Sequence, residues 1–297
     1  MERVALNENL SISRVVYGMW RLGDDADTSP AHVQAKIEAC LAQGITTLDQ
    51  ADIYGAYGAE ALLGTTLKQA PQLRDKVEIV TKCGIVAPIG RYADRRVKYY
   101  DTGRQHIEHS VDQSLQLMNI EQIDLLLIHR PDPMMDPAET GDALDQLVRA
   151  GKVKTVGVSN FKPHDWDLLQ SAMSTPLVTN QIEISVMEIA AFTNGDLAHL
   201  QRNKITPMAW SPLGGGALFK SPPPDVAVKM REVANRLGTD LATLSYAWLL
   251  AHPARIVPVI GTNSIARIQA IRNLDEIAID RETWYEIYEA ALGQPVP

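Results

Sequence analysis

Residues 124–130 read Asp-Leu-Leu-Leu-Ile-His-Arg, and residues 153–160 read Val-Lys-Thr-Val-Gly-Val-Ser-Asn. Between these two apolar stretches, residues 137–150 carry apolar side chains at helical spacing. A strand, a helix and a second strand in this order predict a βαβ unit with two buried, parallel strands. This unit decides the fold, because the same alternation recurs along the chain.

Six further stretches have the length and β-branched content of buried strands. They are residues 14–20, 45–50, 77–83, 178–185, 206–212 and 257–262. Helical patterns fill the gaps at residues 31–42, 59–68, 104–117, 163–171, 196–202, 225–237 and 240–250. Eight alternations in roughly 250 residues predict an α/β protein with a (β/α)8 TIM barrel. A doubly wound sheet is disfavoured, because residues 18–23 match its glycine-rich turn poorly.

Two segments lie outside the repeat. Residues 3–13 alternate around a polar Asn-Glu-Asn turn, which predicts an N-terminal β-hairpin that closes the barrel bottom. Residues 280–292 predict an extra C-terminal helix with Asp280 as its N-cap. No linker-like stretch divides the chain, so we expect residues 1–297 to form one barrel domain.

Composition excludes several classes of protein. The chain has 297 residues, 28 Lys and Arg against 36 Asp and Glu, a formal charge of −8 and 45% hydrophobic residues. These values are typical of a soluble globular protein and disfavour disorder and nucleic-acid binding. The two cysteines and seven histidines show no metal-ligand spacing, so no metal is expected. The apolar runs are too short for a bilayer and no signal peptide is visible, which predicts a cytoplasmic protein without a membrane partner.

Four ionisable residues follow predicted strands, at the end of the barrel where active sites lie. They are Asp49, Tyr54, Lys82 and His129. Taken singly, each has an ordinary structural explanation, such as a helix cap for the aspartate or turn packing for the tyrosine. Lys82 is harder to explain in this way, because a buried ammonium needs an acid and Asp49 is placed to supply one. Together the four residues predict a catalytic site.

The chemistry of this set is specific. A tyrosine with a pKa near ~10 is a poor acid at neutral pH, and a neighbouring ammonium such as that of Lys82 lowers that pKa. His129 can hydrogen-bond the same substrate oxygen, which polarises a carbonyl group. These side chains supply no electrons, so a hydride-carrying cofactor is implied. An alternative is an aldolase that uses Lys82 to form a Schiff base.

The same residues resemble the tetrad of the aldo-keto reductases, and the similarity covers nearly the whole chain. The fragments that carry it are residues 48–55 (Leu-Asp-Gln-Ala-Asp-Ile-Tyr-Gly) with Glu60 and Leu63-Gly64, Leu126, residues 128–132 (Ile-His-Arg-Pro-Asp), residues 154–161 (Lys-Thr-Val-Gly-Val-Ser-Asn-Phe), residues 180–183 (Asn-Gln-Ile-Glu) and residues 210–214 (Trp-Ser-Pro-Leu-Gly). They occur in the family's order, each at a predicted strand end.

The resemblance implies a role for each matched position. Tyr54 would donate the proton, Lys82 paired with Asp49 would lower its pKa, and His129 would orient a small-molecule carbonyl substrate. Trp20 would face the substrate together with Tyr54 and His129. The cofactor contacts implied in this way are Gly18, Met19, Trp20, Ser159, Asn160, Gln181, Trp210, Ser211, Pro212, Leu213, Gly214, Gly261, Thr262, Asn263 and Arg267.

The resemblance favours NADPH (NADP+) as the cofactor, because Arg267 stands where relatives bind the 2′-phosphate. Two positions depart from the family. Many relatives have lysine where Gly261 stands, and Glu-Asn where Ala270 and Ile271 stand. NADH therefore stays open as an alternative cofactor. The long segment 84–103 is expected to govern substrate selectivity, since the tail after the last helix is short.

We therefore expect a reductase of aldehydes or ketones that uses NADPH. Two alternatives stay open at this stage: the Lys82 aldolase, and a cofactor-binding regulatory or sensor subunit with the same fold. The sequence leaves open the physiological substrate, the direction of reaction and the oligomeric state, monomer or weak oligomer.

Overall fold

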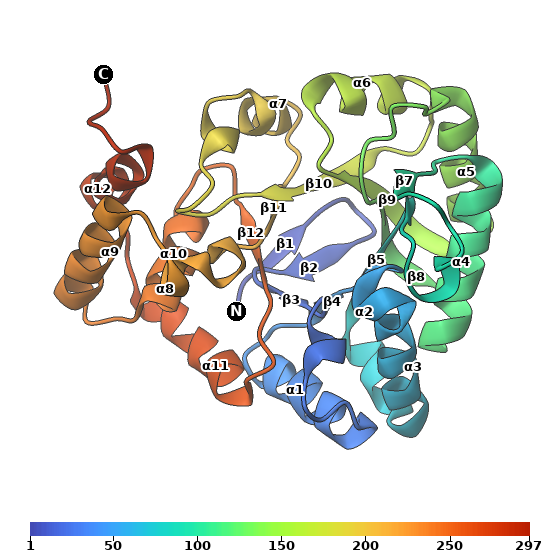
Figure 1. The fold of residues 1–297 in the computed structure, drawn as a ribbon, viewed down its shortest axis with the longest axis horizontal. Coiled ribbons are helices and arrows are strands. Elements are labelled where there is room, and N and C mark those ends of the chain that lie inside the picture. The colour runs from blue at the N-terminus through green and yellow to red at the C-terminus, as the bar shows by residue number, and fades with distance from the viewer.

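The computed structural model describes the backbone of residues 1–297 and all side chains except those of residues 272, 273 and 275. Its centre is a closed barrel of parallel strands (Figure 1). In spatial order these are β3 (Val16–Gly18), β4 (Thr47–Asp49), β5 (Glu78–Cys83), β8 (Ile123–Ile128), β9 (Val153–Ser159), β10 (Leu177–Glu183), β11 (Met208–Trp210) and β12 (Val257–Ile260). β12 pairs back onto β3, with Val259 opposite Val16, and closes the ring. The predicted (β/α)8 barrel is confirmed.

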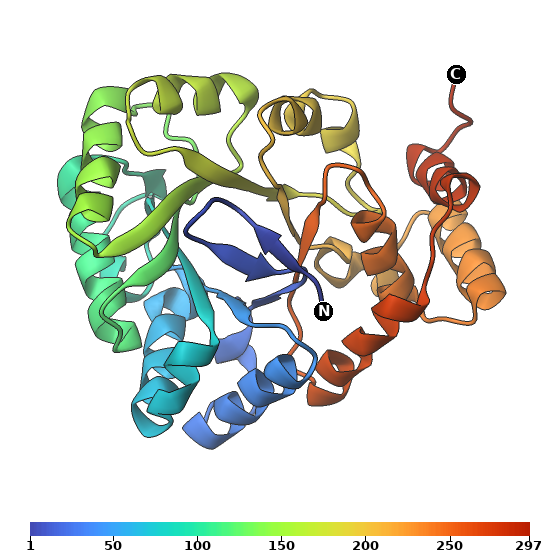
Figure 2. The ribbon, with the colours of Figure 1, turned by 180° about the vertical axis from the view of Figure 1, so that it is seen from behind.

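The N-terminal hairpin closes one end of the barrel, as expected. Its strands β1 (Arg3–Ala5) and β2 (Ser11–Ser13) pair antiparallel, with Arg3 opposite Ser13. Figure 2 shows the hairpin lying across the barrel opening. Its buried side chains Val4, Leu10 and Ile12 share one apolar cluster with the barrel interior. This plug leaves the opposite end, where the strands terminate, free to form a site.

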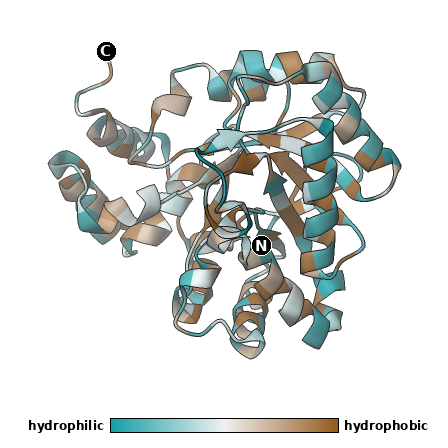
Figure 3. Ribbon diagram, turned by 45° about the vertical axis from the view of Figure 1, so that its right-hand side comes forward, coloured by the Kyte–Doolittle hydropathy of each residue, from teal (hydrophilic) through white to brown (hydrophobic). Residues whose placement is uncertain are grey.

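Helices surround the barrel with their apolar sides inward, and hydrophobic colour is concentrated on the strands (Figure 3). They are α1 (Pro30–Ala42), α3 (Ala59–Gln69), α4 (Arg104–Met118), α5 (Pro137–Arg149), α6 (Pro163–Ser171), α7 (Asp196–Arg202) and α10 (Leu241–Leu250). Two more helices, α9 (Pro224–Leu237) and α12 (Arg281–Leu292), pack against each other outside this ring (Figure 1). Shorter elements are α2 (Tyr54–Tyr57), α8 (Ala217–Lys220) and α11 (Ile265–Gln269). None of the described helices is both long and apolar enough to cross a lipid bilayer.

Local signals explain where the helices begin. Asp136 precedes α5 and accepts hydrogen bonds from the backbone N–H groups of Ala138 and Glu139. Such a cap satisfies amides that lack a partner within the helix. Asp280 caps α12 in the same way through Thr283, and the predicted C-terminal helix is confirmed.

The structure differs from the sequence prediction in the segment after β5. Residues 84–103 contain a small antiparallel ladder of β6 (Ile85–Val86) and β7 (Tyr99–Tyr100), and a 3-10 turn at Gly90–Tyr92. Two-residue strands are too short to produce a recognisable alternation, so the pattern could not reveal them. The barrel strands are also shorter than predicted in several places, since only Val16–Gly18 of residues 14–20 forms β3.

Candidate active site

Lys82 is the centre of the predicted site. It lies on β5, and its Nζ donates to Asp49 Oδ1 and Oδ2 at 2.8 and 2.7 Å, to the main-chain oxygen of Gln50 at 2.8 Å and to Tyr54 Oη at 3.0 Å. The side chains of Lys82 and Asp49 are only 1% and 2% exposed. Neighbouring parallel strands place them together, because Asp49 ends β4 beside Val80 of β5. The buried charge of Lys82 is thereby both paired and fully hydrogen-bonded, as burial requires.

Electrostatics keep Lys82 charged and Tyr54 protonated. Burial lowers the pKa of Lys82, but the Asp49 carboxylate and Tyr54 outweigh this effect and raise the pKa above its ordinary value. Burial raises the pKa of Tyr54, and the Lys82 ammonium lowers it again only in part. The expected lowering by Lys82 is therefore present, but the net direction is upward, since desolvation of the phenolate is the larger effect. A phenol that keeps its proton at neutral pH can act as a donor.

His129 follows β8 and faces Tyr54. Their ring centroids are 6.1 Å apart and the rings meet edge to face. Burial, and after it the charges of Lys82 and Arg130, lower the pKa of His129 well below its ordinary value. The ring is therefore neutral at pH 7 and can donate one N–H to a substrate oxygen. Its main-chain N–H donates to the main-chain oxygen of Cys83 at 2.9 Å, which fixes the backbone just after β8.

The tetrad opens into a cavity of about 960 Å³. Most of the predicted contact residues line it: Gly18, Trp20, Asp49, Tyr54, His129, Ser159, Asn160, Gln181, Trp210, Ser211, Pro212, Leu213, Gly261, Thr262 and Arg267. Trp20 stands at the rim with 55% of its surface exposed. The strand ends of the barrel thus bring together residues that are widely separated in the sequence.

Three predicted cofactor contacts make other contacts in the structure. Met19 is 1% exposed and packs in the hydrophobic core. Gly214 lies against Met187, whose Cγ would be 2.7 Å from an added Cβ. Asn263 donates from Nδ2 to the main-chain oxygen of Arg21 at 2.7 Å. None of the three is among the residues that line the cavity.

A chain of polar side chains extends from the tetrad to the ends of β9, β10 and β11. Gln181 donates to Asp49 Oδ1 at 2.8 Å, and Ser159 donates to the main-chain oxygen of Gln181 at 2.8 Å. Asn160 donates to Ser159 Oγ at 2.8 Å and accepts from Trp210 Nε1 at 2.9 Å. These groups are held rigidly at the cavity wall, where an amide-bearing flat ring could meet fixed donors, acceptors and an aromatic face.

Part of the cavity wall suits an anionic ligand. A Cβ atom added to Gly216 or Gly261 would meet no described atom within 4 Å, so backbone is presented to open space at both positions. Arg267 also lines the cavity. Backbone N–H groups and a guanidinium are the groups that bind phosphate. The residues present therefore fit a nicotinamide dinucleotide.

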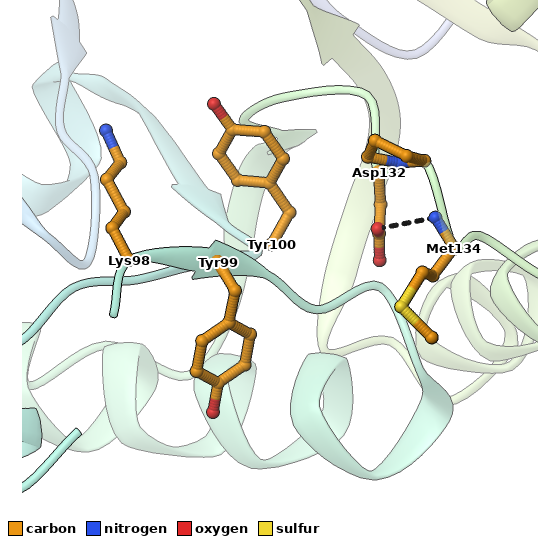
Figure 4. A pocket seen from close by; sticks show the side chains of 6 residues that line it. Lys98, Tyr99, Tyr100, Asp132 and Met134 are labelled. Carbon is orange, nitrogen blue, oxygen red and sulfur yellow. Dashed lines mark hydrogen bonds between the residues drawn. The ribbon is translucent and has the colours of Figure 1, made fainter. Parts of the chain in front are cut away.

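Four further residues line the cavity. Ile85, Ile89 and Lys98 belong to the segment 84–103, which the sequence had singled out only as a whole, and Arg130 had not been singled out. Arg130 lies over the Trp210 ring, 5.7 Å from its centroid. Lys98 also borders a separate hollow of about 440 Å³ with Tyr99, Tyr100, Asp132, Pro133 and Met134 (Figure 4). The position of Arg130 directly after His129 was the one signal in the sequence that could have revealed it.

Among the residues whose side chains the structure describes, no group of three or more His, Cys, Asp or Glu could hold a metal ion.

Comparisons with known proteins give a consistent result. The model of the "Aldo/keto reductase family" matches residues 14–291. A "6-dehydroglucose reductase" of Agrobacterium fabrum is 60% identical over 100% of both chains, and one of Novosphingobium aromaticivorans is 38% identical over 98% of this chain and 95% of its own. An aldo/keto reductase from Klebsiella pneumoniae, solved with NADP and acetate, has a TM-score of 0.78 at 24% identity and covers 99% of this chain and 96% of its own.

Proposed function

The chain belongs to the aldo-keto reductase family, and on this premise we propose that it reduces an aldehyde or ketone to an alcohol with NADPH, with Tyr54 as the proton donor. The observation that carries the proposal is the position of Tyr54, whose hydroxyl lies 3.0 Å from the ammonium of Lys82 at the wall of the large cavity. A protonated phenol beside a fixed cation is suited to protonating a developing alkoxide.

The residues of the chain divide the work between orientation and proton transfer. When bound, the nicotinamide supplies the hydride for the carbonyl carbon. His129 and Tyr54 hydrogen-bond the carbonyl oxygen, and Tyr54 transfers its proton there as negative charge develops. Lys82, held by Asp49, stabilises the phenolate left on Tyr54. Water then returns a proton to Tyr54 after the alcohol leaves.

The preference for NADPH is assigned to Arg267, which lines the cavity. A guanidinium binds a phosphate group more strongly than a ribose hydroxyl. We expect Arg267→Ala to weaken NADPH binding roughly tenfold, which corresponds to one charged hydrogen bond, and to leave NADH binding unchanged. Quenching of tryptophan fluorescence during titration with each cofactor measures this. An equal loss of affinity for NADPH and NADH would mean that Arg267 does not bind the 2′-phosphate.

A sugar aldehyde is the proposed substrate class. Two relatives, 60% and 38% identical to this chain, carry the name 6-dehydroglucose reductase. The substrate end of the cavity carries the donors of Lys98 and Arg130 in addition to apolar Ile85 and Ile89. Such donors can bind the hydroxyl groups of a sugar while the carbonyl lies between Tyr54 and His129.

The test is to follow loss of NADPH absorbance with a panel of 6-dehydroglucose, other sugar aldehydes, simple aldehydes, ketones and quinones. With NADPH deuterated at C4, the deuterium should appear on the former carbonyl carbon of the product. We expect the highest kcat/KM for a sugar aldehyde. Failure of every carbonyl to consume NADPH would overturn the proposed function.

The aldolase alternative is disfavoured by the surroundings of Lys82. Its ammonium contacts Asp49 and its pKa is raised, whereas a Schiff-base lysine must lose its proton to attack a carbonyl. Lys82 is also absent from the residues that line the cavity. Borohydride treatment in the presence of substrate should therefore leave Lys82 unmodified.

A further inference from the structure

The backbone directly after Tyr54 adopts an unusual conformation. Gly55, Ala56 and Tyr57 have φ values of 56°, 52° and 70°, so three consecutive residues are left-handed. Only glycine adopts this region freely, and each of the other two residues costs about 1–2 kcal/mol. Such a turn persists only where its surroundings hold it. Its conformation matters because it determines where the Tyr54 side chain points.

The segment after β5 packs directly on this left-handed turn. An added Cβ on Gly90 would lie 2.1 Å from the main-chain oxygen of Ala56, so only glycine permits this approach. Tyr57 Oη accepts a hydrogen bond from the Ala87 N–H and donates to the main-chain oxygen of Ile85, each at 3.0 Å. Residues 85–90 are thus tied to the turn through both backbone and side chain.

Arg91 adds a third connection to this region. Its Nη2 lies 3.5 Å from Asp52 Oδ2, and the Asp52 side chain is completely buried. The guanidinium carbon of Arg91 lies 4.7 Å from the ring centroid of Tyr57 and 5.2 Å from that of Tyr92, within the range of cation–π attraction. Arg95 and Arg96 of the same segment are exposed. Arg91 alone of these three is turned inward, between the turn and the residues that lead to it.

The burial of Arg91 lowers the stability of the protein, because several of its polar atoms are shielded from water without a hydrogen-bond partner. Its Nε and Nη2, and both carboxylate oxygens of Asp52, are buried without a hydrogen-bond partner among the described residues. Each buried polar atom without a hydrogen-bond partner lowers the free energy of unfolding by about 1–3 kcal/mol. Asp52 itself is fixed, because its N–H donates to the Lys82 main-chain oxygen at 3.0 Å. Arg91 therefore contacts the segment on both sides of Tyr54: Asp52 before it and Tyr57 after it.

We propose that Arg91 is a positioning residue for Tyr54, which holds the left-handed turn so that the Tyr54 phenol stays in hydrogen-bond contact with Lys82. This inference rests on the proposed function for its effect on catalysis. Without the guanidinium, the turn relaxes toward right-handed backbone conformations and the phenol moves away from Lys82. Arg91 touches none of the reacting groups, so it acts only through Asp52 and Tyr57.

The test compares Arg91→Gln with Arg91→Lys and with Arg96→Gln, the matched change at an exposed arginine of the same segment. We expect Arg91→Gln to lower kcat roughly 10- to 100-fold, as a displacement of about 1 Å at a reacting group does, with NADPH affinity within about twofold of the wild type. Arg91→Lys should recover part of the lost kcat, since it keeps the charge. Arg96→Gln should match the wild type.

A second readout follows Tyr54 without turnover. In protein labelled with ¹³Cζ-tyrosine, the Tyr54 resonance is assigned by its absence from Tyr54→Phe. We expect Arg91→Gln to shift this resonance, and to move the high-pH limb of the kcat profile upward, because a more distant Lys82 lowers the pKa of Tyr54 less. Arg96→Gln should change neither property. A purely structural role for Arg91 would lower thermal stability and leave both unchanged.

The outcomes separate this inference from the proposed function. If Arg91→Gln leaves kcat, the pH profile and the Tyr54 resonance unchanged, the positioning role is overturned. If the resonance moves in Arg91→Gln while the wild-type protein consumes no NADPH with any carbonyl, the positioning role stands and the proposed function fails. Loss of NADPH binding in both Arg91→Gln and Arg91→Lys also counts against the positioning role, because it means that the changes disturb the protein beyond Tyr54.

Discussion

Asp49 and Asp52 lie three residues apart, are both buried and each face a cation from the β5 region, yet their environments differ. Both oxygens of Asp49 are hydrogen-bonded to Lys82, and one also accepts from Gln181. Neither oxygen of Asp52 has a hydrogen-bond partner among the described residues, and the nearest cation, Arg91, is 3.5 Å away. A nearby cation is thus not the same as a satisfied pair, and only Asp49 and Lys82 are placed to hold a fixed charge.

The pKa of Asp52 reflects this difference. Burial raises it to about 8, and the Glu60 carboxylate contributes in the same direction. Arg91 and Lys82 lower it, but by less. Asp52 is therefore largely protonated at neutral pH, whereas the Lys82 ammonium is kept charged by Asp49. The first pair can serve acid–base chemistry, and the second serves the shape of the turn.

The largest expected effect comes from breaking the satisfied pair with Lys82→Met. The Asp49 carboxylate would stay buried without its cation, which costs about 3–5 kcal/mol of the free energy of unfolding. The rate kcat should fall at least ~10²- to 10⁴-fold, because Tyr54 loses the cation that stabilises its phenolate. Urea unfolding and NADPH oxidation measure the two effects. Lys154→Met, at an exposed strand position, should change stability by less than about 0.5 kcal/mol. Equal stabilities of Lys82→Met and wild type would contradict the assigned role of the pair.

A smaller perturbation of the same pair is Tyr54→Phe. Lys82 keeps its bonds to Asp49 and Gln50, so we expect the free energy of unfolding to change by no more than about 1 kcal/mol. The rate kcat should still fall ~10²- to 10⁴-fold, because the general acid is lost, and NADPH should bind normally. Single-turnover rates and cofactor titration check this. Normal reduction of reactive aldehydes by Tyr54→Phe would show that another group donates the proton.

The third perturbation is at the unsatisfied pair, and its effect is on stability and depends on pH. Since folding raises the pKa of Asp52, the wild-type protein loses stability as pH rises from about 4 through about 8. Asp52→Asn removes this titration, so its stability relative to wild type should increase by up to about 1.4 kcal/mol per pH unit in this window and then level off. Thermal melts at pH 5 to 9 measure it, with Asp75→Asn, an exposed change, as the control. A difference that does not vary with pH would refute the raised pKa.

Much of the fold could be predicted from the sequence because its signals are local. The alternation of short β-branched strands with amphipathic helices gives the barrel, and caps such as Asp136 and Asp280 mark helix starts. The adjacency of two parallel strands sets Asp49 opposite Val80, and Lys82 lies two residues further along the same strand, within reach of Asp49. The strand and helix assignments depend on side-chain periods of 2.0 and 3.6 residues, which can be recognised in the amino-acid sequence alone.

The interior of residues 84–103 could not be predicted in this way. The sequence suggested a selectivity loop rich in arginine and tyrosine, and the structure divides it into two parts. Ile85, Ile89 and Lys98 line the cavity, whereas Gly90 and Arg91 pack on the turn after Tyr54. Side chains in irregular segments have no fixed period, so the direction in which each one points depends on contacts made by the folded chain.

The order of residues by itself determined the eight-stranded barrel, the hairpin that closes it and the identity of the four groups at one rim. Only the tertiary structure decided which of the buried charges are satisfied, that burial outweighs Lys82 in raising the pKa of Tyr54, and that Arg91 turns inward while Arg95 and Arg96 stay exposed. The physical reason is that desolvation and hydrogen bonding depend on the full three-dimensional surroundings of a group, whereas secondary structure depends mainly on its neighbours along the chain.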